Sequence, residues 1–261
     1  MNLTSLHDAK VIEAFLRRDA RLHLYELGDL DDFFFPHTTW WGVEERGQLV
    51  AIALLYGATE LPVLVALGEP SIVRTMLGKL GPLLPRRFYA HLTPDTSQAL
   101  GPWKREPRGL HDRMILTDPS CLDEVDSVEA VPLGPADAHD LEAFYASAYP
   151  AHWFDPRMLA TGVYRGVRAR GGNRQIVSAA GVHVLSRTRR VAAIGNVATN
   201  PAHRGRGLAR IVCAAVCRAL VADSVDVIGL NVLSSEPSTI RLYEALGFTK
   251  VASYEEVSCT V

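Results

Sequence analysis

The sequence predicts a mixed α/β fold built from two halves that repeat one order of elements. The chain has 261 residues, enough for two domains, and its 48% of apolar and 21% of charged residues are typical of globular proteins. Strand-like and helix-like segments alternate throughout. We place the domains at residues 1–120 and 128–261, joined by an acidic linker at 121–127. An unrelated α+β cap at the N-terminus is the alternative to an internal duplication.

The elements expected in the first half can be laid over the order of those expected in the second. A helix is expected at 8–18, and strands at 39–45 and 48–56 follow it. The remaining expected elements are a strand at 61–67, a helix at 71–80, a strand at 86–91, a short helix at 96–100 and a strand at 112–116.

The second half repeats the order. A short strand is expected at 128–133, then a helix that ends at Ala148, and a second short helix that begins after the N-cap Asp155. The remaining expected elements are an antiparallel meander of strands at 162–168, 175–185 and 190–199, a helix at 208–221, a strand at 225–232, a helix at 238–246 and a strand at 248–257. The helix at 208–221 is apolar nearly all round, which predicts burial against a sheet.

The overall charge gives no sign of a nucleic-acid or membrane partner. Lys and Arg number 27 against 29 for Asp and Glu, a formal charge of −2. No segment approaches 18 consecutive apolar residues, and the first residues lack the pattern of a signal peptide. We therefore expect a cytoplasmic protein.

The four cysteines form no CxxC pair. Cys213 and Cys217 lie four residues apart on an expected helix, a spacing that can place two thiols on one face for metal or redox chemistry. The surrounding run is almost wholly apolar, which favours small core residues instead. We therefore expect no metal site.

A long stretch of the second half contains no acidic residue. Between Asp155 and Asp223 there is no Asp or Glu, whereas arginine recurs. Any single arginine can be solvated or paired with a carboxylate from elsewhere in the fold, but the stretch as a whole favours an anionic ligand. Nucleic acid is not the expected anion, because almost no aromatic stacking residues are interleaved with the arginines. The arginines are Arg157, Arg165, Arg168, Arg170, Arg174, Arg187, Arg189, Arg190, Arg204, Arg206, Arg210 and Arg218.

The sharpest motif is a glycine-containing loop at 200–209, between an expected strand and the apolar helix. Gly205 and Gly207 allow positive φ and the close approach of a ligand. The unpaired N–H groups of the first helical turn lie at the positive end of the helix dipole and can hold phosphate oxygens. No Gly-Lys-Ser/Thr follows, and the strand belongs to an antiparallel meander, so neither a P-loop nor a dinucleotide site is expected.

At this loop the sequence resembles the GNAT superfamily of acetyl-CoA-dependent N-acetyltransferases. The family signature Arg/Gln-x-x-Gly-x-Gly/Ala is matched by Arg204, Gly207 and Ala209. A second block, residues 237–248, is similar to the family's ending, in which a helix carries a Tyr just before Leu-Gly-Phe. The resemblance covers residues 128–257. It implies tandem GNAT-like mixed-sheet domains, of which the C-terminal one carries the acetyl-CoA-binding strand, loop and helix.

The resemblance also implies site residues. Backbone amides of the loop would hold the CoA pyrophosphate, and the main chain of Val197 and Thr199 would pair with the pantetheine arm like an added strand. The family's splay between its fourth and fifth strands would lie between 190–199 and 225–232. Tyr243 would be the general acid for the departing thiolate, with a core aromatic as the alternative. The implied cofactor-binding residues are Val197, Ala198, Thr199, Arg204, Gly205, Arg206, Gly207, Leu208 and Ala209.

Two departures from the family pattern bear on catalysis. Ser235 and Glu236 stand where many relatives have an Asn before the last helix. The family's frequent fourth-strand Glu has no counterpart, and Asn196 cannot take a proton at pH 7. His183 is the candidate general base because it titrates near neutral pH, and a structural histidine is the alternative. His152, Glu236 or a water chain could serve instead.

The first half is not expected to bind CoA. In place of the phosphate loop it has Gly68-Glu69-Pro70-Ser71, which brings a carboxylate and a proline where N–H groups are needed. We expect this half to cover the acceptor or to form a homodimer.

The sequence thus predicts an enzyme that moves the acetyl group of acetyl-CoA to a primary amine by direct attack in a ternary complex. The expected partner is an amine-bearing small molecule or peptide. Aromatic residues in the second half would wall its pocket or, alternatively, pack as core. An inactive acyl-CoA-binding sensor or regulator is the alternative function, because the acidic base is missing. The aromatic cluster comprises Tyr145, Tyr149, His152, Trp153 and Phe154.

Overall fold

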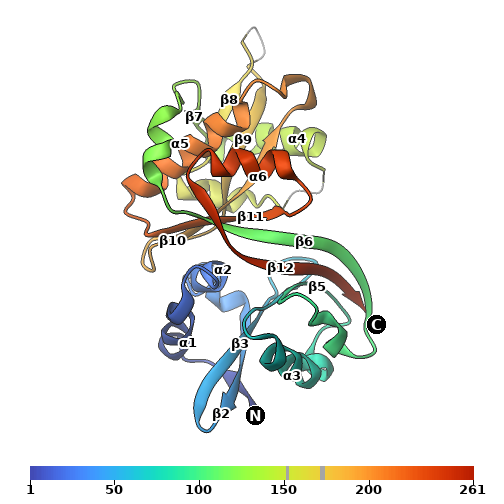
Figure 1. The fold of residues 1–261 in the computed structure, drawn as a ribbon. Helices are drawn as coiled ribbons and strands as arrows, with labels where there is room; N and C mark the ends of the chain where they lie inside the picture. The colour runs from blue at the N-terminus through green and yellow to red at the C-terminus, as the bar shows by residue number, and fades with distance from the viewer. Residues whose placement is uncertain (151–152, 171–173) are drawn as a thin grey trace. The chain divides into compact units, whose positions relative to one another are not determined.

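The computed structural model describes residues 1–150, 153–170 and 174–261 (Figure 1). By their internal contacts the residues fall into two compact units. The first unit comprises 1–113, 231–237 and 250–261, and the second comprises 114–230 and 238–249. The predicted division at 1–120 and 128–261 therefore did not anticipate that short C-terminal segments belong to the first unit.

The first unit contains helices and a mixed sheet. Its first five strands lie side by side in the order in which they occur in the chain. Strands β1 to β4 are antiparallel neighbours, β4 and β5 are parallel, and β12 pairs antiparallel with β5. Its elements are β1 (Asn2–Leu6), α1 (Ala9–Leu16), α2 (Leu24–Gly28), β2 (Thr38–Glu45), β3 (Gln48–Tyr56), β4 (Val63–Ala66), α3 (Pro70–Leu80), β5 (Arg87–Leu92) and most of β6 (Lys104–Leu116) and β12 (Phe248–Thr260). The sequence did not predict β1 or α2, and β6 begins earlier than the strand expected at 112–116.

The core of the first unit forms around α3. Val73, Met76, Leu77 and Leu80 recur at helical spacing and are fully buried. They share one hydrophobic cluster with alternate residues of neighbouring strands, because successive side chains of a strand point to opposite faces. The strand residues of this cluster include Phe88, Ala90 and Leu92 of β5 and Val257 and Cys259 of β12. The C-terminal strand is therefore part of this core.

A polar network on the opposite face of β5 and β12 centres on Glu256. Its carboxylate accepts hydrogen bonds from the hydroxyls of Tyr89 and Tyr254, and the Nε2 atoms of His91 and His111 lie 3.5 and 3.6 Å from its oxygens. Burial by itself would raise the pKa of Glu256, but the two histidines and the two hydroxyls together hold it below its usual value. The network fixes one register for β12, since a slip would bury this charge unpaired.

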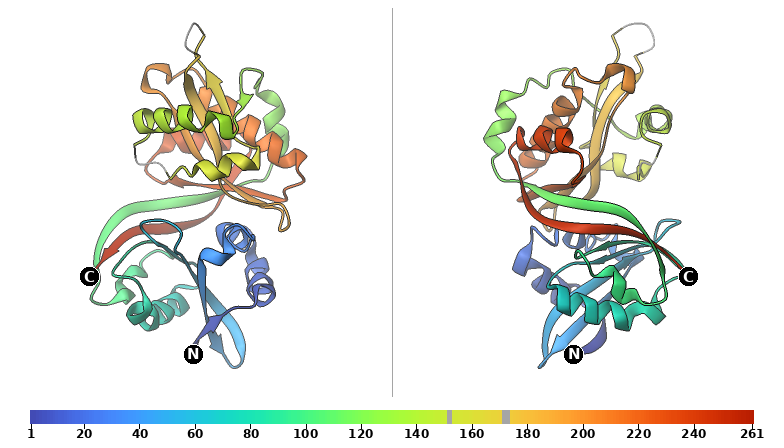
Figure 2. Two further views of the ribbon diagram at one scale, coloured as in Figure 1. Left: turned by 180° about the vertical axis from the view of Figure 1, so that it is seen from behind. Right: turned by 45° about the vertical axis from the view of Figure 1, so that its right-hand side comes forward.

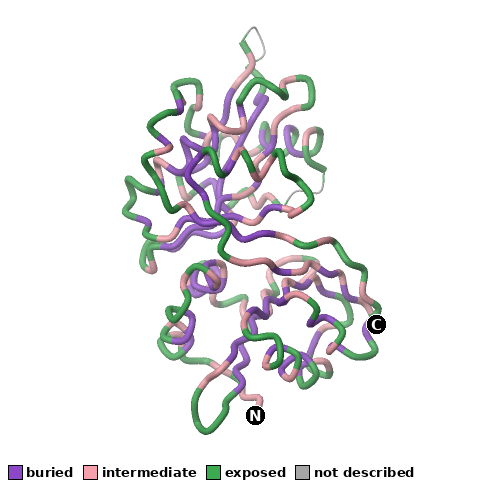
Figure 3. Tube along the Cα trace, in the orientation of Figure 1, coloured by how far each residue is buried: buried purple, intermediate pink, exposed green. Residues whose placement is uncertain are grey.

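The second unit is a sheet with helices on both faces. Figures 1 and 2 show α5 and α6 on one face of the strands and α4 on the other. Nearly every residue of β9 is buried, as Figure 3 shows for the centre of this unit. Its elements are a 3-10 helix (Pro119–Glu124), β7 (Val131–Pro132), α4 (Ala138–Ala148), a 3-10 helix (Pro156–Thr161), β8 (Arg165–Arg168), β9 (Ile176–Ser186), β10 (Val191–Thr199), α5 (Leu208–Ala222), most of β11 (Val227–Leu233), α6 (Pro237–Glu244) and the start of β12.

Strands β8, β9 and β10 form the predicted antiparallel meander, and α5 leads from β10 to the parallel strand β11. The first unit has the same order of elements. The meander that ends in β4 is followed by the helix α3 and by β5, which is parallel to β4. This common order confirms the predicted tandem arrangement of two mixed-sheet units. The expected strand at 128–133 is only the two residues of β7.

The expected linker at 121–127 is packed rather than free. Leu122 and Val125 are buried, and the Arg218 guanidinium of α5 donates to the carbonyl oxygens of both and to the Ser127 hydroxyl. Such contacts satisfy backbone groups that a solvated linker would leave to water. Within the described part of the chain, no helix is long and apolar enough to cross a membrane.

Candidate active site

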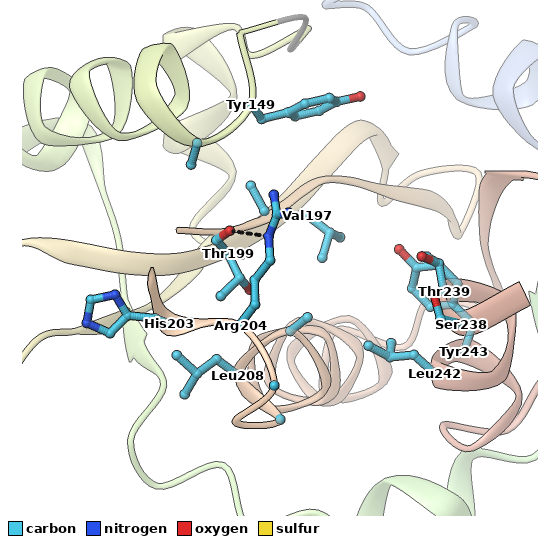
Figure 4. Close-up of a pocket in the computed structure, with 15 residues that line it drawn as sticks. Tyr149, Val197, Thr199, His203, Arg204, Leu208, Ser238, Thr239, Leu242 and Tyr243 are labelled. Atoms are coloured by element: carbon cyan, nitrogen blue, oxygen red, sulfur yellow. Dashed lines mark hydrogen bonds between the residues drawn. The ribbon is translucent and has the colours of Figure 1, made fainter. Parts of the chain in front are cut away.

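A cavity of about 490 Å³ opens in the second unit between the end of β10, the start of α5 and α6. In Figure 4 the side chains of Ser238, Thr239 and Tyr243 from α6 lie on one side of it, and Thr199 and Arg204 lie toward the other. The lining residues are Ala148, Tyr149, Val197, Ala198, Thr199, His203, Arg204, Gly205, Gly207, Leu208, Ala209, Ser238, Thr239, Leu242 and Tyr243.

The cavity lies where β10 parts from β11. Pairing between the two strands joins Val191–Ala193 to Val227–Gly229 and goes no further, although β10 continues to Thr199. On its other edge β10 stays paired with β9, and the Asn200 N–H donates to the Val177 carbonyl. Because backbone groups alternate between the two edges of a strand, the N–H and C=O of Thr199 and Val197 point to the open edge. This is the splay that the family resemblance implied between 190–199 and 225–232.

A β-bulge at Asn196 separates the paired and open parts of β10. The residue has φ +52°, and the register with β9 shifts between Gly195 and Ala198, the interval that contains it. Its carbonyl accepts a hydrogen bond of 2.7 Å from the Tyr145 hydroxyl, and its amide donates to the Tyr164 hydroxyl at 3.3 Å. Burial raises the pKa of both tyrosines, which keeps them protonated donors at neutral pH. The network holds the bulge in place.

The loop from Arg204 to Ala209 has the geometry of an anion site. Gly205 and Gly207 have φ of +76° and +75°, and a Cβ on either would meet no atom within 4 Å. Within the described residues, the N–H groups of 205–209 have no hydrogen-bond acceptor. They lie at the N-terminus of α5, a helix of 15 residues, where the dipole favours negative charge. The loop can therefore hold a phosphate group by its backbone.

The arginines of the acid-free stretch divide into two groups. Several of those away from the loop pair with carboxylates, for example Arg168 with Asp137 and Asp140, and Arg187 with Asp223, whereas Arg165 and Arg218 donate to backbone carbonyls. Arg204, Arg206 and Arg210 form no ion pair with any residue that the structure describes. Three arginines without a carboxylate partner therefore lie on or next to the loop, where their charge is available to an anion; this follows from the pairing and was not visible in the sequence.

Tyr243 lines the cavity from α6. Its side chain is buried, and its ring packs edge-on against Phe248 at 5.9 Å between centroids. The residue is therefore packed as a core aromatic and also faces the cavity, and its role as general acid stays a prediction.

Two predicted site residues are not part of the lining. Arg206 is exposed on the loop beside the cavity. His183 is half-buried on β9, with its ring packed over Gly195 so closely that a Cβ there would lie 1.9 Å from the ring. Its role as base stays a prediction, as does that of exposed Glu236; His152 lies outside the described residues.

The structure also brings residues to the cavity that the sequence did not assign to the donor site. They are Ala148, Tyr149, His203, Ser238, Thr239 and Leu242. The last three belong to the block that resembles the family's ending, which was the signal available for them. Tyr149 belongs to the predicted aromatic cluster, whose members Tyr145 and Phe154 instead pack on each other at 5.0 Å.

Cys213 and Cys217 are buried within α5, as the core interpretation predicts. Burial raises the pKa of Cys213, and raises that of Cys217 to about 12, so neither thiol is ionised near neutral pH.

The equivalent helix of the first unit, α3, carries its own anion. The carboxylate of its N-cap, Glu69, accepts hydrogen bonds from the Ile72 N–H and the Ser71 hydroxyl, and Pro70 has no N–H to offer. The parallel strands before and after it stay paired up to Ala66 and Leu92, and Thr93 bonds to both backbone groups of Gly68 beyond that point. The first unit thus has neither the open edge nor the free amides of the second.

Comparisons with known proteins agree with this geometry. Residues 135–248 match the model of the GNAT acetyltransferase family. No curated protein matches the chain. Many solved structures share its fold, among them the following three. A Drosophila protein is 14% identical with a TM-score of 0.70, over 98% of this chain and 97% of that one. A tandem GNAT protein from the clavulanic acid biosynthesis pathway is 15% identical with a TM-score of 0.60, over the same shares. A GNAT-family acetyltransferase from Colwellia psychrerythraea is 11% identical with a TM-score of 0.58, over all of both chains.

The fold, the open edge of β10 and the loop before α5 support acyl transfer in general. Residues 135–248 therefore match a GNAT acetyltransferase domain, and the chain as a whole shares its fold with a tandem GNAT protein.

Proposed function

We propose that the protein is an N-acetyltransferase that transfers the acetyl group of acetyl-CoA to a primary amine by direct attack in a ternary complex. The observation that carries this proposal is that one cavity joins the open edge of β10, the loop whose amides at 205–209 have no acceptor among the described residues, and Tyr243. These are the three groups that a pantetheine arm, a pyrophosphate and a departing thiolate require.

Acetyl-CoA would bind along these groups in order. The pyrophosphate would accept hydrogen bonds from the loop amides, helped by the α5 dipole and by unpaired arginine charge. The pantetheine amides would pair with the open backbone groups of Val197 and Thr199, as an added strand does at a sheet edge. The thioester would then lie in the splay, toward the side chain of Tyr243.

The reaction would form a C–N bond and break the C–S bond. The neutral amine attacks the thioester carbonyl carbon, and the tetrahedral intermediate collapses with departure of the sulfur. The Tyr243 hydroxyl gives a proton to the thiolate as general acid, and the amine nitrogen loses one proton to a base. A free thiol has a pKa of about 8.5, so the thiolate is a fair leaving group, and Tyr243 accelerates a step that is already feasible.

The mechanism also needs a base that removes the proton from the amine nitrogen. None of the residues that line the cavity is an Asp or Glu. His183 on β9 is the described residue we propose for proton removal, through a water, because it lies over β10 beside the bulge. An acceptor amine with a pKa near 7 would need less help from a base and would be a preferred substrate.

The missing carboxylate also favours the second candidate function, an inactive acyl-CoA-binding sensor. Both functions require acetyl-CoA binding, and only the enzyme releases free CoA with an amine present. A thiol-release assay with acetyl-CoA and pooled aminoglycosides, polyamines, amino acids and peptides separates them. Amine-dependent thiol release supports the enzyme, and tight binding without release from any pool supports the sensor.

For the acceptor we propose a chemical class, and for the location of the protein a compartment. The unassigned acceptor is an amine-bearing small molecule or peptide, and the cytoplasm, where acetyl-CoA would be available, is the proposed compartment.

A further inference from the structure

The side-chain amide of Asn196, at the bulge of β10, contains a buried hydrogen-bond acceptor that lacks a donor. The residue is 3% exposed, and no group in the described part of the chain donates a hydrogen bond to its Oδ1 atom. The other atom of the amide, Nδ2, donates to the Tyr164 hydroxyl. A buried acceptor without a partner costs free energy and is uncommon in native proteins, so a donor from a bound molecule would stabilise it.

The hydrogen bonds around the amide fix which of its two atoms lacks a partner. The Tyr164 hydroxyl gives its proton to the Val182 carbonyl at 3.1 Å, so toward Asn196 it can only accept, and Nδ2 must face it. The Tyr145 hydroxyl gives its proton to the backbone carbonyl of Asn196 at 2.7 Å. Both tyrosine protons are therefore committed elsewhere, and neither can satisfy Oδ1.

Asn196 lies next to the cavity. The two residues that follow it, Val197 and Ala198, line the cavity, and so does Tyr149, one helical turn beyond the Tyr145 that holds its carbonyl. The amide is held only by the Nδ2 contact of 3.3 Å, which is slightly longer than usual, and the χ2 torsion of an asparagine is broad. Rotation of the amide can therefore direct Oδ1 toward a donor at this end of the cavity.

The proposed base, His183, lies on the same face of the sheet as this amide. Its ring packs over Gly195, the residue before Asn196. His183 also follows Gly181 by two residues on β9, and a Cβ on Gly181 would meet the Tyr164 ring, so both side chains are on the face that carries Tyr164. Figure 2 shows α4 on one face of this sheet and α5 and α6 on the other. An amine held by Oδ1 would therefore have a base on its own side of the strands.

We propose that Asn196 binds the acceptor amine and orients it for attack. Its Oδ1 accepts one N–H of the neutral amine, which turns the nitrogen lone pair toward the thioester carbonyl carbon. Attack forms the C–N bond and leaves the nitrogen positively charged, and this strengthens the hydrogen bond in the transition state. This role rests on the proposed function, because it requires acetyl transfer in this cavity.

The protons balance in the remaining steps. The second N–H of the amine gives its proton to His183 through a water, and the C–S bond breaks with departure of the thiolate. The thiolate takes a proton from Tyr243, and solvent returns the proton from His183 to Tyr243. The N–H on Asn196 stays in place and becomes the amide N–H of the product.

The number of N–H groups on the amine then determines which acceptors react. A primary amine has two, one for Asn196 and one for the base. A neutral secondary amine has only one, which would have to serve both partners. The site should therefore accept primary amines and discriminate against their N-methyl derivatives.

Two substitutions of Asn196 provide the test. N196G removes the amide and keeps the backbone, because glycine readily adopts the φ of +52° found here. N196D also tolerates this backbone and keeps an oxygen in place of Oδ1. S186A is the matched control for the loss of a buried polar side chain, since the buried Ser186 accepts the Arg189 N–H at the other end of β9.

The measurement is thiol release by the full chain with acetyl-CoA. The probes are the amine from the pools named above that reacts fastest and its N-methyl derivative, for example glycinamide and sarcosinamide. The quantity compared is the ratio of kcat/KM for the primary amine to kcat/KM for its N-methyl derivative. CoA affinity by calorimetry and Tm are measured on the same samples.

The wild type should prefer the primary amine by about tenfold or more, as expected for one hydrogen bond. In N196G this preference should fall to within about threefold and the KM of the primary amine should rise about tenfold, while CoA affinity stays at the wild-type value. N196D should keep the preference. S186A should lower the Tm and leave the preference unchanged, a combination that a merely structural role of Asn196 would share.

A wild type without this preference, an unchanged preference in N196G, or its loss in N196D would overturn the role of Asn196 alone. A wild type that binds CoA but releases no thiol with any amine pool would overturn the enzymatic function together with it.

Discussion

Replacing Gly207 by valine separates the backbone's role in ligand binding from its role in folding. Gly207 has φ +75° and caps the N-terminus of α5, and a Cβ there meets no atom within 4 Å. The added side chain would therefore not clash inside the protein. It would instead project into the space through which a phosphate must approach the amides of the loop.

The structure provides a matched control for the strain. Gly47, in the turn between β2 and β3 of the first unit, has φ +76° and also has no atom within 4 Å of its Cβ position. A non-glycine residue in this region costs about 1–2 kcal/mol, and a β-branched one lies at the upper end. At about 2–4 °C per kcal/mol, G207V and G47V should each lower the Tm by about 4–8 °C.

Only G207V should affect the ligand. We expect CoA affinity to fall more than about 100-fold in G207V, which corresponds to about 2.7 kcal/mol, and to stay at the wild-type value in G47V. Calorimetric titration of both variants, after circular dichroism shows that they are folded, measures this. An unchanged CoA Kd in folded G207V would refute the assignment of this loop to phosphate.

Three further predictions concern catalysis, a close approach of the backbone, and pH. Y243F should lower kcat by about 100-fold or more, while CoA affinity and Tm stay at wild-type values, because only the proton donor is lost; wild-type turnover would mean that Tyr243 is a core residue alone. G247A should cost about 3 kcal/mol or more by chemical denaturation, because Gly247 has φ +90° and a Cβ there would lie 2.0 Å from the Asp118 carbonyl oxygen; a loss below 1 kcal/mol would contradict this packing. E256Q should be less stable than the wild type at pH 7. Because the folded-state pKa of Glu256 lies below its usual value, its carboxylate stabilises the protein above about pH 4.5, and this contribution is lost as the pH falls through the folded pKa. The difference in Tm between E256Q and the wild type should therefore shrink on acidification, and a constant difference would count against the network.

The sequence predicted the second unit best because its signals are local. The glycines before α5 indicate the positive φ values of the loop. Turn-forming residues between apolar runs indicate the strands of the meander. The splay followed from the family resemblance alone, and the pairing of β10 with β11 then showed where it begins.

Long-range pairing could not be predicted in the same way. Nothing local in residues 250–260 indicates that they pair with β5, since the partner is decided by Glu256 meeting His91 and His111 and by Val257 entering the core around α3. The same holds for the arginines, because the carboxylates that neutralise Arg168 and Arg187 come from outside the acid-free stretch. Short elements such as β1 and α2 were missed because too few residues carry their periodicity.

The first unit contains most of the C-terminal strand β12, and this decides which form of the protein is suited to studying it. A fragment of residues 1–120 would lack β12, and with it Val257 and Cys259 of the core. Ligand binding by the first unit is therefore better examined in the full chain.

Calorimetric titration of the full chain with acetyl-CoA tests the central claim most directly. The second unit offers an open strand edge and free amides, whereas the amides of α3 in the first unit are capped by Glu69. We expect one molecule of acetyl-CoA to bind per chain. No binding at concentrations up to a few millimolar, or two molecules per chain, would contradict it.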